Sequence, residues 1–270
     1  MPMLHHLHTD SPELMEEVLN APRPVVTVGV KMQTAGWESD FHSHQKAQLM
    51  LSLSGIATCE AEGGIWLVPP KSALFVPGVT MHRVTVLGDI EGYAVFIEPN
   101  ESQILPRQCA ALTVTPLLRE LIIRSAQLSV DPPQDGVEPH LTALLLNEIA
   151  TAPAGGIHLP MPTEPRLRTI FTSMMENPAH RGTIESWARH AGLSERTLAR
   201  VVAAETGMSF GRWRQQLNLI LAMQWMAAGA SVQQVALDLG YESAGSFVTM
   251  FRKALGTSPA RYMSNHSGEL

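Results

Sequence analysis

The stretch of sequence that decides the fold is SVQQVALDLGYESAGSFVTMFRKALGTSP, at residues 231–259. Apolar residues recur at helical spacing on both sides of Gly240, and Ser231 and Ser243 stand where two helices need N-caps. A glycine between two helices can adopt a positive φ at little cost. This order of helix, glycine turn and helix is typical of a helix-turn-helix unit.

An earlier stretch of the chain repeats this pattern. Residues 184–193 align with residues 232–241, and Gly192 takes the place of Gly240. Further on, Leu198, Val202, Gly207, Ser209 and Trp213 align with Phe247, Phe251, Gly256, Ser258 and Tyr262. Two copies of one small fold keep their apolar positions while their surface positions diverge. We therefore predict tandem helix-turn-helix units, with Thr183 and Ser194 as the N-caps of the first.

One long helix is expected between the two units, over residues 210–228. Its length of about 28 Å makes it a spacer that could place two recognition helices in successive major grooves, about 34 Å apart. The recognition helices are expected over residues 194–205 and 243–255, because the second helix of such a unit enters the major groove. An ordinary helical bundle is the alternative, but it would rarely repeat the glycines and caps by accident.

The distribution of charge also favours a nucleic-acid partner for the back half alone. The 270-residue chain has a net charge of −6, which divides into −9 over residues 1–162 and +3 over residues 163–270. A chain of this length is comfortable as two domains. A net charge of +3 is a weak signal by itself, although its sign suits a polyanion.

Other classes of protein are disfavoured by what the sequence lacks. No apolar run approaches the roughly 18 residues of a membrane helix, and the first ten residues lack the order of a signal peptide. The two cysteines, Cys59 and Cys109, match no metal motif and are too few for a disulfide scaffold. We therefore expect a cytoplasmic protein with reduced thiols and no membrane partner.

The second unit carries a specific run of residues that extends this interpretation. The run consists of Val235-Ala236, Gly240-Tyr241-Glu242-Ser243, Phe247, Phe251-Arg252, Gly256-Thr257-Ser258-Pro259 and Arg261-Tyr262, preceded by Glu205-Thr206-Gly207-Met208-Ser209. With it, residues 165–265 resemble the AraC/XylS family of transcription regulators. The resemblance implies a monomer that reads two adjacent segments of the major groove with its two recognition helices.

The same resemblance, carried over residue by residue, assigns the base-facing positions. In the first unit they are Glu195, Arg196, Ala199 and Arg200. Arg196 and Arg200 are candidates for direct readout, because a guanidinium can bond guanine O6 and N7 together. A phosphate contact, or a surface ion pair with Glu195, is the alternative for either arginine.

The matching positions of the second unit are Ala244, Gly245, Val248 and Thr249, none of which can form a bidentate base contact. This departs from family members with polar side chains there. We expect that unit to supply mostly phosphate contacts, through Ser243, Ser246 and the helix N-terminus. The full predicted DNA-binding set is Ser194, Glu195, Arg196, Thr197, Ala199, Arg200, Ser243, Ala244, Gly245, Ser246, Val248 and Thr249.

The front half has a different pattern. Residues 25–98 contain short apolar stretches broken by Gly and Pro pairs, which suggests a small β-barrel or a double sheet. Residues 116–130 and 138–152 then show helical spacing. Two such helices could form a hairpin that covers the barrel or supplies a dimer interface.

Five residues of this half are spaced as in the first motif of the cupin family: Gly36, His42, His44, Gln48 and Gly55, with Gln where cupins usually have Glu. Pro77-Gly78 and His82 resemble the second motif, with the glycine one place early. The resemblance implies a cupin barrel over residues 25–97.

The histidines leave three interpretations open. His42 and His44 should share one face of a strand, and His82 could join them from a later strand. Three imidazoles and the Gln48 amide oxygen could bind Zn²⁺ or another divalent ion, could contact a small effector, or could be structural. We rank effector contact first and metal second. Trp37, Trp66 and Phe75 could line the same cavity or belong to the barrel core.

Together these features predict a two-domain α+β chain. It has a cupin-like effector-binding domain (1–115), a helical dimerisation or packing segment (116–152), a linker (153–165) and an all-α domain with two helix-turn-helix units (166–265). The predicted function is transcription regulation, with double-stranded DNA, a small-molecule effector, a second copy of the chain and, for an activator, RNA polymerase as partners. No cofactor is required, with a divalent metal in the barrel as the open alternative.

Two other functions compete with this prediction. A metal-dependent cupin enzyme with an accessory helical domain is disfavoured because the motif's Glu is missing. An architectural DNA binder with a vestigial barrel is disfavoured because His42, His44 and His82 are retained. We therefore expect no enzymatic activity. Some cupin-bearing regulators control efflux or transport genes, and such genes are the candidate targets of this chain.

Overall fold

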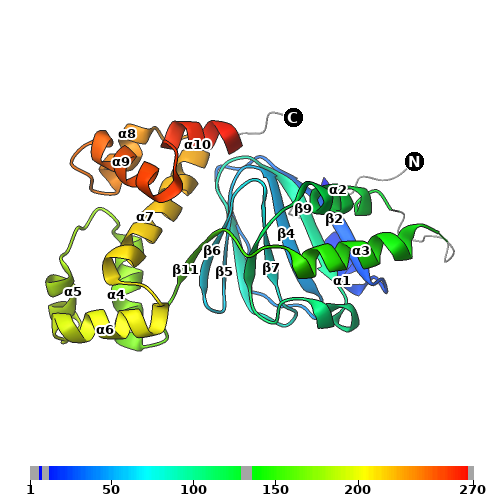
Figure 1. Cartoon of the computed structure of the whole chain (residues 1–270), viewed down its shortest axis with the longest axis horizontal. Coiled ribbons are helices and arrows are strands. Elements are labelled where there is room, and N and C mark those ends of the chain that lie inside the picture. Colours follow the sequence, from blue (N-terminus) through cyan, green and yellow to red (C-terminus); the bar gives the residue numbers. More distant parts are fainter. Residues whose placement is uncertain (1–5, 8–11, 129–135, 267–270) are drawn as a thin grey trace. The chain divides into compact units, whose positions relative to one another are not determined.

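The computed structural model describes residues 6–7, 12–128 and 136–266 (Figure 1). The chain divides into two compact units at the bond between Gly156 and Ile157, and the second unit also takes residues 63–65. This boundary lies inside the linker predicted over residues 153–165. The predicted linker is not wholly irregular, because it contains strand β11 (Ile157–Pro160).

Two sheets form the first unit. One has the strand order β1 (His6–Leu7), β2 (Val25–Met32), β9 (Ile90–Ile97), β4 (Ala47–Ser54), β7 (Ser72–Val76) and β10 (Ala110–Thr113), antiparallel except for the β1–β2 pair. The other contains, in order, β6 (Gly64–Val68), β5 (Ala57–Ala61), β8 (His82–Val86) and β3 (Trp37–Glu38). A β-rich front half was predicted, and this part of the prediction is confirmed.

Helices α2 (Pro116–Ser125) and α3 (Glu138–Thr151) cover one face of the larger sheet (Figure 1). Helix α1 (Pro12–Asn20) packs against β2 and β9 on the other face, and the unit also has the 3₁₀ helix η1 (Pro99–Ile104). Thr115 caps α2 and accepts a hydrogen bond from the backbone N–H of Leu118. The helix predicted over residues 116–130 ends at Ser125, and residues 129–130 lie outside the described residues.

The larger sheet is buried on both of its faces, and successive side chains along each strand point to opposite faces. Leu49 and Phe75 face α2 and α3 and share a core with Leu118, Ile122 and Leu145. Met50 and Leu74, one residue along, instead pack into the core between the two sheets. Strands buried on both faces read as continuous apolar runs, so the sequence pattern does not reveal which residue faces which side.

The second unit is helical. Its helices are α4 (Pro165–Glu176), α5 (Ile184–His190), α6 (Glu195–Thr206), α7 (Phe210–Ala227), α8 (Val232–Asp238), α9 (Ala244–Leu255) and α10 (Pro259–His266). The side chains of the four predicted N-caps each accept a hydrogen bond from a backbone N–H three residues on, at Thr183, Ser194, Ser231 and Ser243. The long predicted helix is α7. None of the helices described is long and apolar enough to cross a membrane.

The two helix-turn-helix units are also joined by the segment between α4 and α5. The Arg181 guanidinium lies 4.0 Å from the centroid of the Tyr241 ring. Asn218 of α7 donates a hydrogen bond of 3.1 Å to the Tyr241 hydroxyl. Gly240 has a φ of +72°, and a Cβ at this position would lie 2.5 Å from the carbonyl oxygen of Ala179. The turn of the second unit therefore rests directly on this segment.

The two turn glycines give a matched pair of substitutions. Gly192→Ala should lower the free energy of unfolding by about 1–2 kcal/mol, because the φ of Gly192, +66°, is in the left-handed region. No steric cost is added, since nothing lies within 4 Å of the new Cβ. Gly240→Ala carries the same backbone cost and must also displace Ala179. We expect it to lower the urea midpoint of the full chain further, as measured by far-ultraviolet circular dichroism. Equal midpoints would contradict the close contact.

Candidate functional site

Helix α6 presents one apolar face and one polar face. Leu198 and Val202 are fully buried against the rest of the helical unit. Arg196 and Arg200 lie one turn apart on the exposed face. Within the described part of the chain neither guanidinium has a hydrogen-bond or ion-pair partner, so the ion pair considered with Glu195 is not formed. Both side chains are therefore free to contact a ligand.

Helix α9 exposes a very different face. Phe247 and Phe251 are buried, Gly245 and Thr249 are exposed on the opposite side, and Ala244 and Val248 are half-buried between the two sides. Thr249 Oγ1 donates to the carbonyl oxygen of Gly245 at 2.9 Å. The Ser246 hydroxyl likewise donates to the carbonyl oxygen of Ser243 at 2.8 Å, and the Ser243 hydroxyl caps the helix. The hydroxyl groups of this helix are thus engaged by its own backbone.

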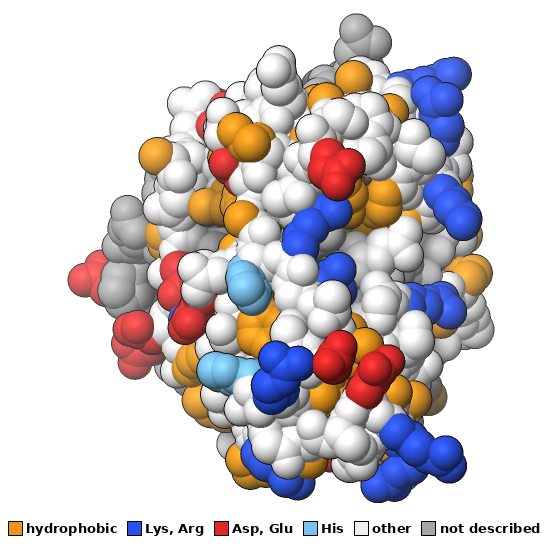
Figure 2. Space-filling view, turned by 90° about the vertical axis from the view of Figure 1, so that its left-hand side faces the viewer, with side chains coloured by type: hydrophobic (Ala, Val, Ile, Leu, Met, Phe, Trp, Pro, Cys, Tyr) orange, Lys and Arg blue, Asp and Glu red, His pale blue; other side chains and the backbone are white. Residues whose placement is uncertain are grey.

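The surface of the helical unit carries dispersed basic side chains. Figure 2 looks onto the side where α5, α6 and α9 lie, and shows Lys and Arg side chains at its right-hand edge, middle and bottom, with acidic side chains between them and at the left. The last turn of α9 adds Arg252 and Lys253. Such a surface suits the phosphate backbone of a nucleic acid.

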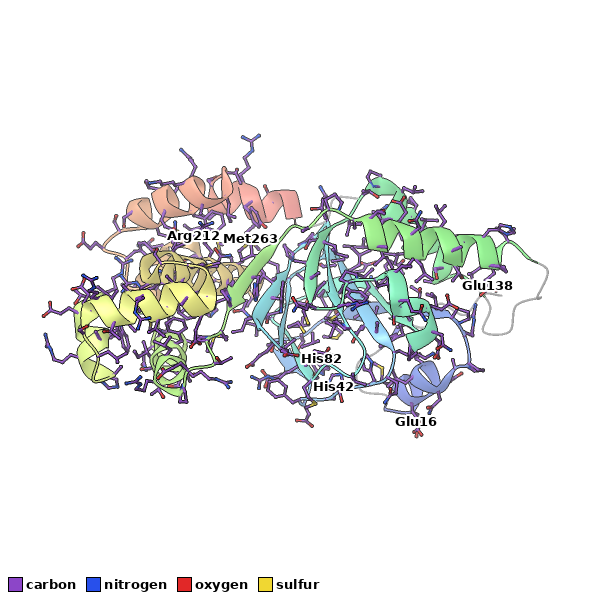
Figure 3. The ribbon with its side chains drawn as sticks, turned by 60° about the horizontal axis from the view of Figure 1, so that its bottom comes forward. Glu16, His42, His82, Glu138, Arg212 and Met263 are labelled. Atoms are coloured by element: carbon purple, nitrogen blue, oxygen red, sulfur yellow. The ribbon has the colours of Figure 1, made fainter. Side chains whose placement is uncertain are left out.

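The three histidines of the first unit come together. His42 and His82 exchange two backbone hydrogen bonds, of 3.0 and 2.9 Å, and their ring centroids lie 4.4 Å apart (Figure 3). The His44 ring lies 5.2 Å from that of His82. The expectation that His42 and His44 share a face of one strand is wrong, because both precede β4 in an irregular segment. The chain turn, not strand alternation, brings their rings together.

Each histidine ring is oriented by a backbone carbonyl group. Nδ1 lies 2.9 Å from the oxygen of Asp40 in His42, 2.7 Å from that of Lys46 in His44, and 2.9 Å from that of Thr80 in His82. A carbonyl oxygen only accepts, so Nδ1 is the protonated nitrogen in each ring. Burial lowers the pKa of His44, and it lowers the pKa of His82 to about 4, so both rings are neutral at physiological pH.

Gln48 lies between two of these rings. The same terminal atom of its carboxamide lies 3.1 Å from Nε2 of His44 and 3.1 Å from Nε2 of His82. One nitrogen from each of the three histidines lies within 4.8 Å of the others. Imidazole nitrogens whose Nδ1–H groups are held by carbonyl oxygens are the usual ligands of zinc and similar ions. The donor set therefore fits a divalent ion.

A cavity of about 130 Å³ lies between the two sheets, beside this cluster. Its wall includes Trp37, His42 and Gln48, as predicted, together with Val30, Met32, Met50, Val86 and Ile90, which the sequence analysis did not single out. Their common signal is alternation: Met32 and Val30 on β2, and Met50 and Gln48 on β4, are two residues apart.

Two predicted cavity residues lie elsewhere. Phe75 faces α2 and α3 and is buried in the core behind the sheet, so the prediction that it lines the cavity is wrong. Trp66 packs against the core between the sheets and is not part of the cavity wall. His44 and His82 reach the cavity only through Gln48 and His42, which do line it.

Comparison with known proteins identifies the helical unit. Residues 187–265 match a family model described as a helix-turn-helix domain. The chain is 40% identical to the HTH-type transcriptional regulator NimR of Escherichia coli K12, over 84% of this chain and 82% of that protein. It is 26% identical to the HTH-type transcriptional regulator RipA of Corynebacterium glutamicum, over 50% of this chain and 39% of that protein. A structure of ToxT from Vibrio cholerae aligns with a TM-score of 0.40 and 10% identity, covering 91% of this chain and 100% of ToxT.

Arg196→Ala and Arg200→Ala should each weaken binding to the cognate DNA site by about 1–3 kcal/mol and relax its sequence preference. Arg166, which is paired with Glu164, offers a matched control, and Arg166→Ala should leave the preference unchanged. The measurement is affinity for cognate and random duplexes at one salt concentration. Equal losses on both duplexes would show that the two arginines contact only phosphates.

Proposed function

The chain belongs to the AraC/XylS family of helix-turn-helix transcriptional regulators, and from this premise we propose that it couples DNA binding to a small molecule held in its β-rich unit. DNA-binding transcription regulation is the function of the family, so the chain is not expected to be an enzyme. The proposal concerns how the DNA is read and what controls the reading. The observation that carries it is the cavity beside the histidine cluster.

We propose that α6 makes most of the base-specific contacts and that α9 contacts mainly phosphates. On α6, Arg196 and Arg200 are exposed and have no partner among the described residues, which leaves their forked donors available for guanine. On α9, the outward positions are small or apolar, and the hydroxyl of Thr249 is engaged by Gly245. That helix fits the groove closely and holds phosphates through its N-terminus.

The proposed sensor is a cupin-like barrel in the first unit. Its cavity lies between the two sheets, with a mostly apolar wall that a few polar groups interrupt, among them His42 and Gln48, as in many small-molecule sites. The exposed Leu117 and Leu144 of α2 and α3, 49% and 42% accessible, support the proposal that these helices also hold a second copy of the chain. The cytoplasm, where such a regulator meets DNA, remains the proposed location.

A divalent metal is the second candidate for the histidine cluster. The observation that favours it is the orientation of all three rings by carbonyl groups, which leaves three Nε2 lone pairs close together. His42, His44 and His82 would hold the ion, with the Gln48 amide oxygen as a weaker fourth ligand. When bound, the ion would fix this end of the barrel and offer the cavity a positive charge.

Selection of bound genomic fragments by the full chain tests the proposal as a whole. We expect a small set of promoter fragments, whose neighbouring genes would indicate the class of effector. Recovery of fragments without a shared sequence would contradict sequence-specific regulation.

Saturation mutagenesis of one selected site should give an asymmetric footprint. Each base change under α6 should weaken the free energy of DNA binding by about 1–3 kcal/mol, and most changes under α9 should weaken it less. Changes from thymine are the expected exception, because Ala244 and Val248 could contact its methyl group. Affinities are read at fixed salt so that the phosphate contribution stays constant. Equal selectivity under both helices would overturn this assignment.

Replacing both His42 and His44 with Ala should abolish the response of a selected promoter to its effector or metal. The DNA affinity without effector should be little changed, because the 163–270 segment carries the recognition helices. His140→Ala, at an exposed position on α3, is the matched control and should respond as the unmodified chain does. A folded double variant with an intact response would rule out the histidine cluster as part of the sensor.

A further inference from the structure

The wall of the cavity excludes charged ligands. Among the described residues that line it there is no Asp, Glu, Lys or Arg. A charged molecule would lose its hydration on entering and gain no opposite charge. The volume of about 130 Å³ is close to the roughly 150 Å³ of an engineered cavity that holds benzene. The cavity therefore suits an uncharged molecule with one ring.

The position of the proton on each neighbouring histidine ring fixes the orientation of the Gln48 carboxamide. In the neutral form, His44 and His82 carry their proton on Nδ1, because in each ring Nδ1 faces a backbone carbonyl oxygen, which can only accept. Their Nε2 atoms are therefore acceptors, and both lie 3.1 Å from one terminal atom of Gln48. Only an NH₂ group can donate to two acceptors at once. Since the oxygen and nitrogen of a carboxamide have the same shape, the atom between the rings is the NH₂ group.

This orientation leaves the Gln48 carbonyl oxygen without a partner in the described part of the chain. Gln48 is only 8% exposed and lines the cavity. A buried acceptor without a donor is unfavourable, and a ligand that donates to it removes this cost. His42 lines the same wall, and in its neutral form it also presents an acceptor, because its Nδ1 faces the carbonyl oxygen of Asp40.

We propose that the cavity takes a compact, uncharged molecule, about the size of one aromatic ring, whose N–H or O–H group donates to the carbonyl oxygen of Gln48. This inference rests on the proposed function of the first unit as a small-molecule sensor. It adds the chemistry of the ligand: one donor group, no charge, and an otherwise apolar surface. A metal ion at the histidines would reverse this chemistry, because Gln48 would turn its oxygen to the ion and its NH₂ group to the cavity.

The test uses three ring compounds of similar size: phenol, which has a donor, toluene, which has none, and benzoate, which is charged. The full chain is kept in a chelator, and binding is followed by NMR of the methyl groups of Met32 and Met50, which line the cavity. Phenol should bind at least about tenfold more tightly than toluene, and benzoate should not bind.

The Gln48→Met variant should lose most of the preference for phenol over toluene, with His42 as the remaining acceptor, while Gln45→Met, at the exposed glutamine three residues earlier, should keep the full preference. Toluene binding in the Gln48→Met variant reports whether its cavity is intact. Should that variant fail to fold, the ring ¹⁵N shifts of His44 and His82 in the unmodified chain show directly which nitrogen of each ring is protonated. A proton on Nδ1 alone in both rings is expected.

Three results would overturn the inference, and they differ in whether they also contradict the proposed sensor function. Toluene binding as tightly as phenol, with shifts at Met32 and Met50, would refute the donor but leave the sensor. A protonated Nε2 in His44 or His82 would refute the orientation of Gln48. Methyl groups that respond to neither ring would refute both the ligand class and the cavity as a sensor site.

Discussion

The burial of the larger sheet on both faces is the constraint on which the first unit depends. Because α2 and α3 cover one face, and the second sheet together with α1 covers the other, the residues of β4, β7 and β9 point in turn to one or the other of two apolar sides. Alternation then decides the role of every side chain: Leu49 holds the helices, and Gln48 and Met50 reach the cavity. A shift of one residue in register would exchange these roles.

The same alternation explains how a polar group comes to lie in an apolar interior. Gln48 stands on the cavity face of β4, opposite Val76 in register, and is held there by two histidines from outside the strand. Buried polar groups are tolerated when their hydrogen bonds are satisfied. The two Nε2 atoms satisfy one end of the Gln48 carboxamide, and backbone carbonyl groups hold the two histidine rings in place, so only the other end of the carboxamide is left to the cavity.

The helical unit depends on different physics. Its N-caps are local, because each involves a hydroxyl group and a backbone N–H three residues away. The relation between the two helix-turn-helix units is tertiary, since it rests on α7, on the stacking of Arg181 over Tyr241 and on the contact between Gly240 and Ala179. The spacing of α6 and α9 is therefore fixed by contacts that lie away from their exposed faces.

The sequence by itself determined the elements whose causes are local. The caps at Thr183, Ser194, Ser231 and Ser243, the turn glycines, the long helix α7 and the family itself could all be read from short-range pattern. Which residues meet in the first unit was decided by tertiary structure alone. Phe75 was misplaced because both faces of β7 are apolar, and His42 and His44 were misplaced because an irregular segment, not a strand, carries them. The carbonyl groups that set the protons of the histidines, and so the orientation of Gln48, come from backbone folding, which no side-chain pattern records.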